Sequence, residues 1–198
     1  FNTKLQSATA DAMGGVLFDI VIAPGYEPAA LAVMKRRRRT RVLEVEPGCF
    51  ESGLDFRRIA GGVLVQTPDD AEDDPGKWRV VSKRAPTELE MSDLAFAWKA
   101  VRHVKSNAIV LAREGAIVGT GSGQPNRVIS LRIALDLARE RARSSAMASD
   151  AFLPFADSVE LAANNGVAAI IQPSGSIRDK EIVEAADRLG MALVFTQI

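Results

Sequence analysis

The sequence predicts an α/β fold in which a mostly parallel β-sheet is covered by helices. Short apolar runs of strand length alternate with longer segments of helical spacing along most of the chain. In the second half, single helical segments separate successive runs, which is typical of right-handed crossovers between parallel strands. The 198 residues suit one large domain or parts of two, so a substantial core is expected.

Residues 1–76 contain the shorter expected elements. We predict a strand at residues 59–65, which runs through Gly61 and Gly62. We also predict a linker at residues 68–76, where clustered acidic side chains repel one another and stay solvated. The other expected elements are helices at residues 5–16 and 28–37 and strands at residues 17–23 and 40–45.

Residues 77–198 give the clearer pattern. Thr87-x-x-Glu90 is a capping box, in which both side chains satisfy free N–H groups at the beginning of a helix. The turn at Glu114-Gly115 predicts a hairpin, so the sheet should carry an antiparallel edge. The expected strands are residues 78–81, 108–112, 116–120, a stretch near Met147, 167–171 and 191–196; the expected helices are residues 87–104, 127–143, 157–164 and 179–189.

Composition excludes several classes of function. Lys and Arg number 25 and balance 25 Asp and Glu, so we expect neither nucleic-acid nor membrane-surface binding. No apolar run approaches the roughly 20 residues of a membrane span. One His and one Cys cannot supply the about four Cys or His ligands of a structural zinc site. Cys49 alone forms no internal disulfide, so a reducing, cytoplasmic location is expected.

Three loops follow predicted strands and should meet at one edge of the sheet. They comprise residues 119–127, 149–157 and 172–178. In open α/β sheets, ligands bind at the carboxyl ends of the strands. The convergence of these loops is therefore the strongest indication of a binding site.

The first loop contains three glycines, which would let the backbone approach a ligand, followed by Gln124, Asn126 and Arg127. Amides and a guanidinium near a helix start suit a phosphate or a planar carboxamide. A plain turn with a surface arginine is an equal alternative, because no Walker lysine follows and the dinucleotide fingerprint is incomplete.

The second loop places Phe152 and Phe155 beside Asp157, so it could hold a flat heterocycle between rings and bind its ring donors. Alternatively, both rings fill the core and Asp157 is the N-cap of its helix. The third loop, Pro173-Ser-Gly-Ser-Ile-Arg-Asp, is rich in hydroxyl groups and could hold an anion or form a capped turn.

Three other features favour structural interpretations. His103 follows a helix, where a cationic ring complements the helix dipole. Lys35 to Arg39 resembles a nucleic-acid patch, but the neutral chain favours a solvated helix end. Cys49 has no activating neighbours in the sequence.

Five segments, taken in order, resemble the family of bifunctional purine biosynthesis proteins. The likeness is to the C-terminal part of the domain that formylates aminoimidazole carboxamide ribonucleotide (AICAR), and it covers essentially the whole chain. The segments are Val21-Ile-Ala-Pro-Gly-Tyr, Lys83-Arg-Ala-Pro-Thr, His103-Val-Lys-Ser-Asn-Ala, Ser149-Asp-Ala-Phe-Leu-Pro-Phe and Ile171-Gln-Pro-Ser-Gly-Ser.

The resemblance implies formyl transfer from 10-formyltetrahydrofolate to the 5-amino group of AICAR. In the longer protein, an IMP cyclohydrolase domain then closes the ring. It also implies cytidine-deaminase-like three-layer units without zinc, and intertwined homodimers with active sites between the subunits. Residues 1–76 would end the first such unit and connect it to the second, residues 77–198.

Site residues are implied by matching positions. Asn107 matches a catalytic residue, and Ser106 and Asp150 match part of a site for a monovalent cation such as potassium, although Val104 and Ala108 replace hydroxyl residues there. Positions that contact the nucleotide are Arg127, Phe152, Asp157 and Ser176, and positions near the folate are Asp19, Val128, Pro154 and Phe155.

Two parts of the family pattern have no match. The family's catalytic Lys-His pair belongs to a segment that would precede Phe1, and its basic C-terminal tail would follow Ile198. We therefore weigh two hypotheses: part of a bifunctional formyltransferase, or a non-catalytic fragment that keeps the fold and weak nucleotide binding. A nucleotide regulator unrelated to purine synthesis is a third, and turnover separates the first two.

Overall fold

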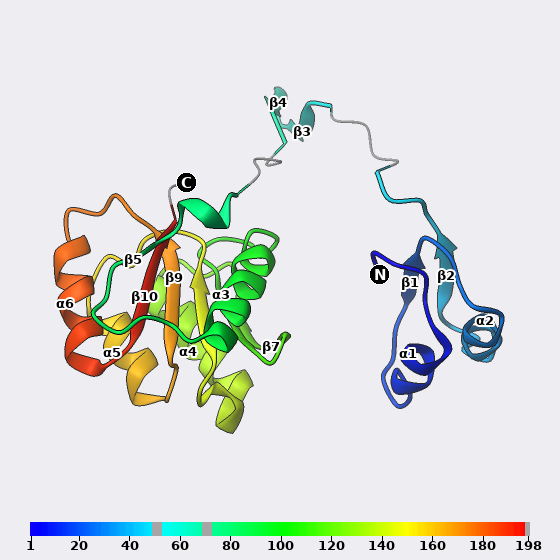
Figure 1. The fold of residues 1–198 in the computed structure, drawn as a ribbon. Coiled ribbons are helices and arrows are strands. Elements are labelled where there is room, and N and C mark those ends of the chain that lie inside the picture. Colours follow the sequence, from blue (N-terminus) through cyan, green and yellow to red (C-terminus); the bar gives the residue numbers. More distant parts are fainter. Residues whose placement is uncertain (49–52, 69–72, 197–198) are drawn as a thin grey trace. The chain divides into compact units, whose positions relative to one another are not determined.

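The computed structural model describes residues 1–48, 53–68 and 73–196 (Figure 1). It divides the chain into two compact units, Phe1–Ala71 and Glu72–Ile198, whereas the sequence placed the division after residue 76. The identification of these units with particular subdomains stays a prediction. Cys49 lies outside the described residues.

Unit 1 (Phe1–Ala71) contains a two-stranded parallel sheet and two short helices around a small apolar core. Helix α2 begins at Pro28, because proline lacks the N–H group that would have no partner in the first turn. The elements are α1 (Ser7–Ala12), β1 (Ile20–Ala23), α2 (Pro28–Lys35), β2 (Arg41–Glu44), β3 (Asp55–Ile59) and β4 (Gly62–Gln66). The core residues are Leu5, Ala10, Met13, Val21, Ala23, Ala30 and Met34.

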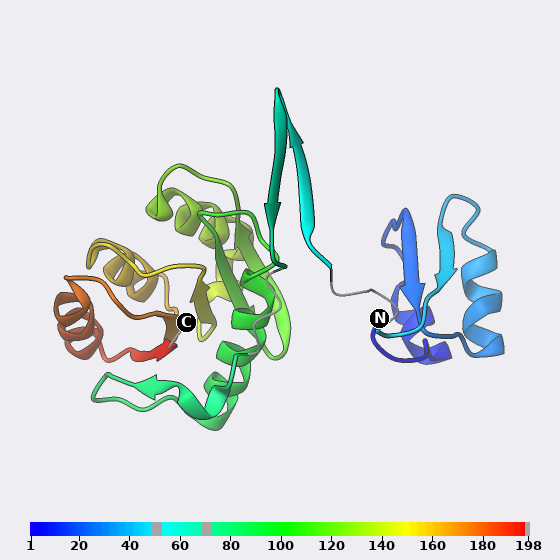
Figure 2. The same ribbon diagram turned by 90° about the horizontal axis from the view of Figure 1, so that it is seen from above.

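The single strand expected at residues 59–65 is wrong, because the chain reverses there. Strands β3 and β4 form an antiparallel hairpin, with Ile59 opposite Gly62 (Figure 2). Gly61 has a φ of 82°, a left-handed conformation that glycine adopts without strain and that a tight turn requires. Every residue of both strands is exposed.

Unit 2 (Glu72–Ile198) is built on a six-stranded sheet with the order β5-β10-β9-β8-β6-β7. Strands β8, β9 and β10 are parallel neighbours, and the hairpin β6–β7 forms an antiparallel edge, as the sequence predicts. The elements are η1 (Pro75–Lys77), β5 (Arg79–Val80), α3 (Glu88–Val101), β6 (Ile109–Arg113), β7 (Ala116–Gly121), α4 (Arg127–Ala138), η2 (Arg139–Ala142), β8 (Ala146–Ser149), α5 (Asp157–Asn164), β9 (Ala169–Pro173), α6 (Asp179–Leu189) and β10 (Ala192–Thr196).

The sheet of unit 2 is the middle of three layers. Helix α3 packs on one face through Leu94, Ala97 and Val101, and α4, α5 and α6 cover the other. Figure 1 shows α5 and α6 on one side of β9 and β10, with α3 on the other. These layers confirm a mixed α/β fold with helices over a central sheet whose strands β7 to β10 run in one direction.

Two sets of polar contacts involve α3, one within the first turn of the helix and one to the β6–β7 hairpin. The capping box is present, since Glu90 N–H donates to Thr87 Oγ1 at 3.2 Å and Thr87 N–H donates to Glu90 Oε2 at 2.8 Å. The carboxylate of buried Asp93 accepts the N–H groups of Glu114 and Gly115, at 2.9 and 2.8 Å. The hydrogen bonds to Asp93 fix the turn of the β6–β7 hairpin against the helix.

Within the described ranges, no helix combines the length and the apolar character that crossing a membrane requires.

Candidate functional site at the carboxyl ends of the strands

The predicted convergence of three loops is confirmed in unit 2. Strand β7 is antiparallel to β6, β6 is antiparallel to β8, and β8 is parallel to β9. The loops that follow β7, β8 and β9 therefore leave the same edge of the sheet. Asn107 lies at this edge too, because it precedes β6, which runs the opposite way.

Asp150 is the centre of a polar network at this edge. Its Oδ1 accepts the N–H of Ala108 at 3.0 Å and an N–H of Arg127 at 2.9 Å. The Ser106 side chain also favours the ionised form of the same carboxylate. Both charged side chains are largely buried, with 12% of Arg127 and 14% of Asp150 exposed. The residue pair predicted for a cation, Ser106 and Asp150, is thus brought together around a guanidinium.

The pKa of Asp150 lies below its usual value of 3.8. Burial acts in the opposite direction, because desolvation disfavours the charged form. The hydrogen bonds from Ser106, Ala108 and Arg127, together with the positive charge of Arg127, outweigh burial. Asp150 is therefore ionised at neutral pH and holds the Arg127 guanidinium in one orientation.

Arg127 is the first residue of α4 and reaches across to the second loop. Besides the ion pair with Asp150, it donates to the carbonyl oxygen of Phe152 at 3.3 Å. Its Nε is buried and has no hydrogen-bond partner among the described residues. The guanidinium is thus fixed by two partners and keeps a donor for a third.

Asn107 is held by the first loop. Its Nδ2 donates to the main-chain carbonyl oxygen of Gln124 at 2.8 Å. The Ser130 hydroxyl donates to the main-chain carbonyl oxygen of Asn107 at 2.6 Å. Within the described part of the chain, no hydrogen bond engages its Oδ1. The amide is therefore oriented through its nitrogen and presents an acceptor.

The second loop turns the two predicted aromatic rings outward. Phe152 is 40% exposed and Phe155 is 49% exposed, whereas Leu153 between them is fully buried in the core. The alternative in which both phenylalanines fill the core is therefore wrong. Pro154, which lies between the two phenylalanines in the sequence, is half-buried.

Gln172 positions this loop, a role that the sequence did not reveal. Its side chain is fully buried at the end of β9, and Oε1 accepts the N–H of Leu153 at 3.1 Å. Nε2 is buried without a hydrogen-bond partner in the described residues. A polar residue inside an otherwise apolar strand, Ala169–Pro173, was the available signal.

The third loop is a capped turn. Both oxygens of the Asp179 carboxylate are used, because Gly175 N–H donates to Oδ2 at 2.8 Å and Ser176 N–H donates to Oδ1 at 3.2 Å. Two of the N–H groups that could bind an anion, those of Gly175 and Ser176, are therefore already occupied. Half-buried Ser176 accepts the N–H of Arg178 at 3.1 Å, and the Arg178 guanidinium lies 4.6 Å from the centre of the Phe155 ring.

Two glycines of the first loop do not serve a ligand. Gly119 and Gly121 lie in β7, where α4 packs against the strand. A Cβ on Gly121 would lie 1.8 Å from the Ser130 carbonyl oxygen, and one on Gly119 would lie 2.1 Å from that of Ala134. The expectation that these glycines admit a ligand is wrong, since they admit a helix backbone.

The remaining predicted residues lie apart from this network. Val128 is in the first turn of α4, and its N–H donates to Asn126 Oδ1 at 2.8 Å. Asp157 begins α5 but makes no side-chain cap, because Ala156 is the N-cap residue. Asp19 belongs to unit 1, where its carbonyl oxygen accepts the Arg41 N–H at 2.8 Å. His103 is exposed just beyond α3.

Ser106 and Asp150 do not fit a potassium ion well. Potassium requires several oxygen ligands, and Asp150 Oδ1 already accepts the N–H of Ala108 at 3.0 Å and an N–H of Arg127 at 2.9 Å. A second cation next to the guanidinium would be repelled. In the described part of the chain, no three His, Cys, Asp or Glu side chains form a metal-binding group.

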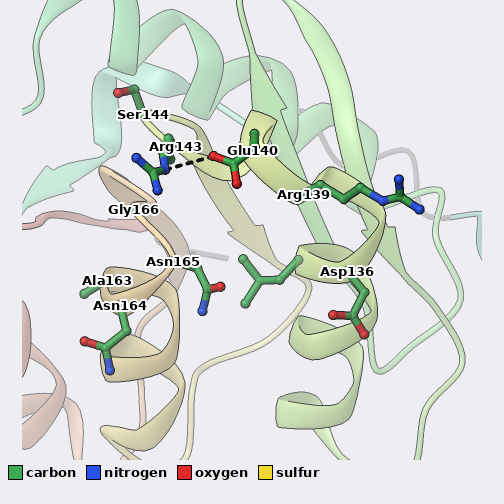
Figure 3. Close-up of a pocket in the computed structure, with 10 residues that line it drawn as sticks. Asp136, Arg139, Glu140, Arg143, Ser144, Ala163, Asn164, Asn165 and Gly166 are labelled. Atoms are coloured by element: carbon green, nitrogen blue, oxygen red, sulfur yellow. Dashed lines mark ion pairs between the residues drawn. The ribbon is translucent and has the colours of Figure 1, made fainter.

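A cavity of about 760 Å³ lies at the opposite end of the unit, where α4 and α5 end (Figure 3). An ion pair of 3.2 Å between Glu140 and Arg143 lies on its rim, and both side chains are mostly exposed. Figure 3 shows Arg139 extending away from this pair. The cavity therefore gathers no convergent set of buried polar groups.

Comparison with known proteins identifies the family. The model of the AICARFT/IMPCHase bienzyme family matches residues 1–137. The bifunctional purine biosynthesis protein PurH of Streptococcus pneumoniae is 44% identical over the whole chain, which covers 39% of that protein. PurH of Prochlorococcus marinus is 48% identical over 98% of the chain, and the match covers 38% of that protein. The chain thus spans about two fifths of these relatives.

Among solved structures, RibD of Acinetobacter baumannii gives a TM-score of 0.37 with 15% identity, over 53% of this chain and 33% of that protein. The likeness is too low to carry an argument about the fold.

Proposed function

The chain belongs to the AICARFT/IMPCHase bienzyme family, and we propose that it forms the nucleotide-binding part of the formyltransferase site. The reaction is transfer of a formyl group from 10-formyltetrahydrofolate to the 5-amino group of AICAR. The observation that carries the proposal is the orientation of Arg127 by Asp150, beside Asn107, at the carboxyl end of the sheet.

The chemistry of AICAR explains what Arg127 would do. The amine is a weak nucleophile because its lone pair is delocalised towards the neighbouring carboxamide. An enzyme must fix that carboxamide, move a proton from the amine and stabilise an oxyanion. An oriented guanidinium with a free donor suits the carboxamide oxygen.

Asn107 would act on the transferring group. The Gln124 carbonyl orients the side-chain amide of Asn107, and Ser130 holds the main chain of the same residue. A preorganised amide of this kind can stabilise a transition state. Neither Asn107 nor Arg127 is a good general base. We assign that role to a group from elsewhere in a longer protein or a partner chain.

The second loop supplies flat surfaces for a heterocycle. Phe152 and Phe155 are partly exposed on either side of Pro154, and the Arg178 guanidinium covers one ring. Rings of this kind bind a folate or an imidazole by stacking. Asp157 and Ser176 would contact the nucleotide, and Val128 and Asp19 the folate, as the resemblance implies.

Three further properties are proposals of the same kind. We propose that unit 2 is a cytidine-deaminase-like unit in the C-terminal part of the formyltransferase domain. We also propose that the chain works as a homodimer, since the family pattern places active sites between subunits. The second candidate function is a fragment that binds AICAR without turnover; AICAR binding with no folate-dependent turnover favours it.

The first test is calorimetry with AICAR on the chain itself. We expect Arg127→Ala to lower the affinity about tenfold or more, because a charge-assisted contact contributes about 1.5–3 kcal/mol. Arg127→Lys should not restore it, since lysine lacks the planar fork. Arg132→Ala, an exposed arginine on the same helix, is the matched control and should bind as the parent chain does. Unchanged affinity in Arg127→Ala contradicts the proposal.

A further inference from the structure

Four consecutive arginines line a cavity of about 350 Å³ in unit 1. The cavity lies between the segment that leads into β1 and the segment that follows α2. Leu17, Phe18 and Asp19 form one side, and Arg36 to Arg39 with Thr40 form the other. The cavity therefore combines an apolar wall with a strongly cationic one.

Hydrogen bonds hold the two walls together. Arg37 donates to the carbonyl oxygen of Val16 at 2.8 Å and to that of Met13, and its guanidinium lies 5.7 Å from the centre of the Phe18 ring. Thr40 Oγ1 donates to the Phe18 carbonyl oxygen at 2.7 Å. The cavity is therefore a built feature of the fold, and Arg37 is used in building it.

The other three guanidinium groups are not used in this way. In the described ranges, the side chains of Arg36, Arg38 and Arg39 make no hydrogen bond or ion pair. Lys35 adds a further positive charge, and Asp19 is the one carboxylate that lines the cavity. Like charges this close repel one another, so an anion would relieve the repulsion.

The cationic wall is more than a complement to the helix dipole. One or two basic residues in the last turn would serve the carboxyl end of α2. Here the arginines face an apolar wall in which Leu17 is 97% exposed. An exposed leucine beside unpaired guanidinium groups matches a ligand with an apolar portion and several negative charges.

We propose that this cavity binds a small polyanion that carries an apolar portion. Its negative groups could be the γ-glutamyl carboxylates of a folate or the phosphates of a nucleotide. The anion site stands on the cavity itself, whereas its assignment to the folate rests on the proposed function, in which Asp19 lies near that co-substrate.

The test is calorimetry on the chain with four probes: pteroylpentaglutamate, pteroylmonoglutamate, tripolyphosphate and single-stranded RNA. The key variant is Arg38→Ala/Arg39→Ala. Its matched control is Arg57→Ala/Arg58→Ala, which removes two adjacent exposed arginines from β3. Both pairs are exposed, so neither variant should unfold the chain, and thermal unfolding checks this.

We expect pteroylpentaglutamate to bind about tenfold or more tightly than the monoglutamate. The preference should disappear in Arg38→Ala/Arg39→Ala and persist in the control. Tripolyphosphate binding with the same dependence on Arg38 and Arg39, but equal affinity for the two folates, would assign the same site to a phosphate.

Three outcomes would overturn the inference: no binding of any probe, an equal loss in both double variants, or tighter binding of single-stranded RNA than of either small polyanion. The proposed function is judged separately by AICAR and Arg127. Polyanion binding without AICAR binding would leave this site standing and remove the proposed function, and the converse would do the opposite.

Discussion

The two ends of the sheet in unit 2 differ in how their polar groups are arranged. At the carboxyl end, Asp150 and Arg127 are largely buried and join segments far apart in the sequence. At the amino end, a cavity of about 760 Å³ has an ion pair between two mostly exposed side chains. These buried, oriented polar groups, rather than the volume of a cavity, are the reason why we propose a binding site at the carboxyl end.

The difference follows from the direction of the strands. Strands β7, β8 and β9 all end at one edge, so the loops that carry the proposed site residues meet there. The other edge receives the ends of α4 and α5, whose last turns need only a water or a neighbouring side chain to satisfy their carbonyl groups. The polar groups at the carboxyl edge are therefore fixed by specific hydrogen bonds, whereas the ion pair at the amino edge is mostly exposed.

We expect the largest loss of stability from a side chain added between β7 and α4. The close packing of α4 on β7 supports the carboxyl end of the sheet. Gly121→Ala would place a Cβ 1.8 Å from the Ser130 carbonyl oxygen. We expect a loss of about 3 kcal/mol or more in the free energy of unfolding, measured by urea denaturation. Gly62→Ala is the control, because a Cβ there meets nothing within 4 Å. Equal stability of the two variants would contradict the close approach of the helix to the strand.

Removing the anchor of the second loop should have the next largest effect. Gln172→Leu leaves the buried Leu153 N–H without an acceptor, which costs about 1–3 kcal/mol in unfolding experiments. Thr196→Val on the neighbouring strand is the matched control. Its buried hydroxyl has no partner in the described chain, so its removal should change stability little. A stable Gln172→Leu protein would show that the loop does not depend on this contact.

Acidification should lower the free energy of unfolding by a smaller amount, through the carboxyl end of the sheet. Because the pKa of Asp150 is lowered on folding, its contribution is fully present above about pH 4 and is lost as the pH falls through the lowered value. We expect the difference in unfolding free energy between the parent chain and Asp150→Asn to be constant from about pH 7 to 5 and to shrink below about pH 4. A difference that is independent of pH down to 2 would contradict the assignment.

The smallest effect is expected at the amino end. Glu140→Gln breaks the ion pair with Arg143, in which 75% of the arginine and 87% of the glutamate side chain are exposed. Exposed pairs contribute little, so stability should change by less than about 0.5 kcal/mol. AICAR affinity, measured by calorimetry, should stay the same. A loss of AICAR affinity would contradict the placement of the site at the carboxyl end of the sheet.

Sequence reasoning predicted the features that depend on periodicity and on turn chemistry. The capping box at Thr87, the turn at Glu114-Gly115 and helices α5 and α6 lie where the pattern placed them. The meeting of the three loops followed from strand order alone. These features are local or topological, so one sequence is enough to define them.

Features that depend on packing could not be predicted. Whether a glycine admits a ligand or a helix backbone depends on what faces it, and Gly121 faces Ser130. Likewise, Leu153 fills the core, whereas Phe152 and Phe155 do not. This difference depends on the geometry of the loop. The sequence of the third loop is equally compatible with an anion site and with a capped turn, whereas in the structure Asp179 occupies the N–H groups of Gly175 and Ser176.

The most direct test of the site is an amide NMR titration of the chain with AICAR. We predict that chemical shifts change for Asn107, Arg127 and the loops at residues 149–157 and 172–178, and that those of Asn164 to Gly166 at the amino end stay unchanged. Changes confined to the amino end, or no saturable change at all, would contradict a nucleotide site at the carboxyl ends of the strands.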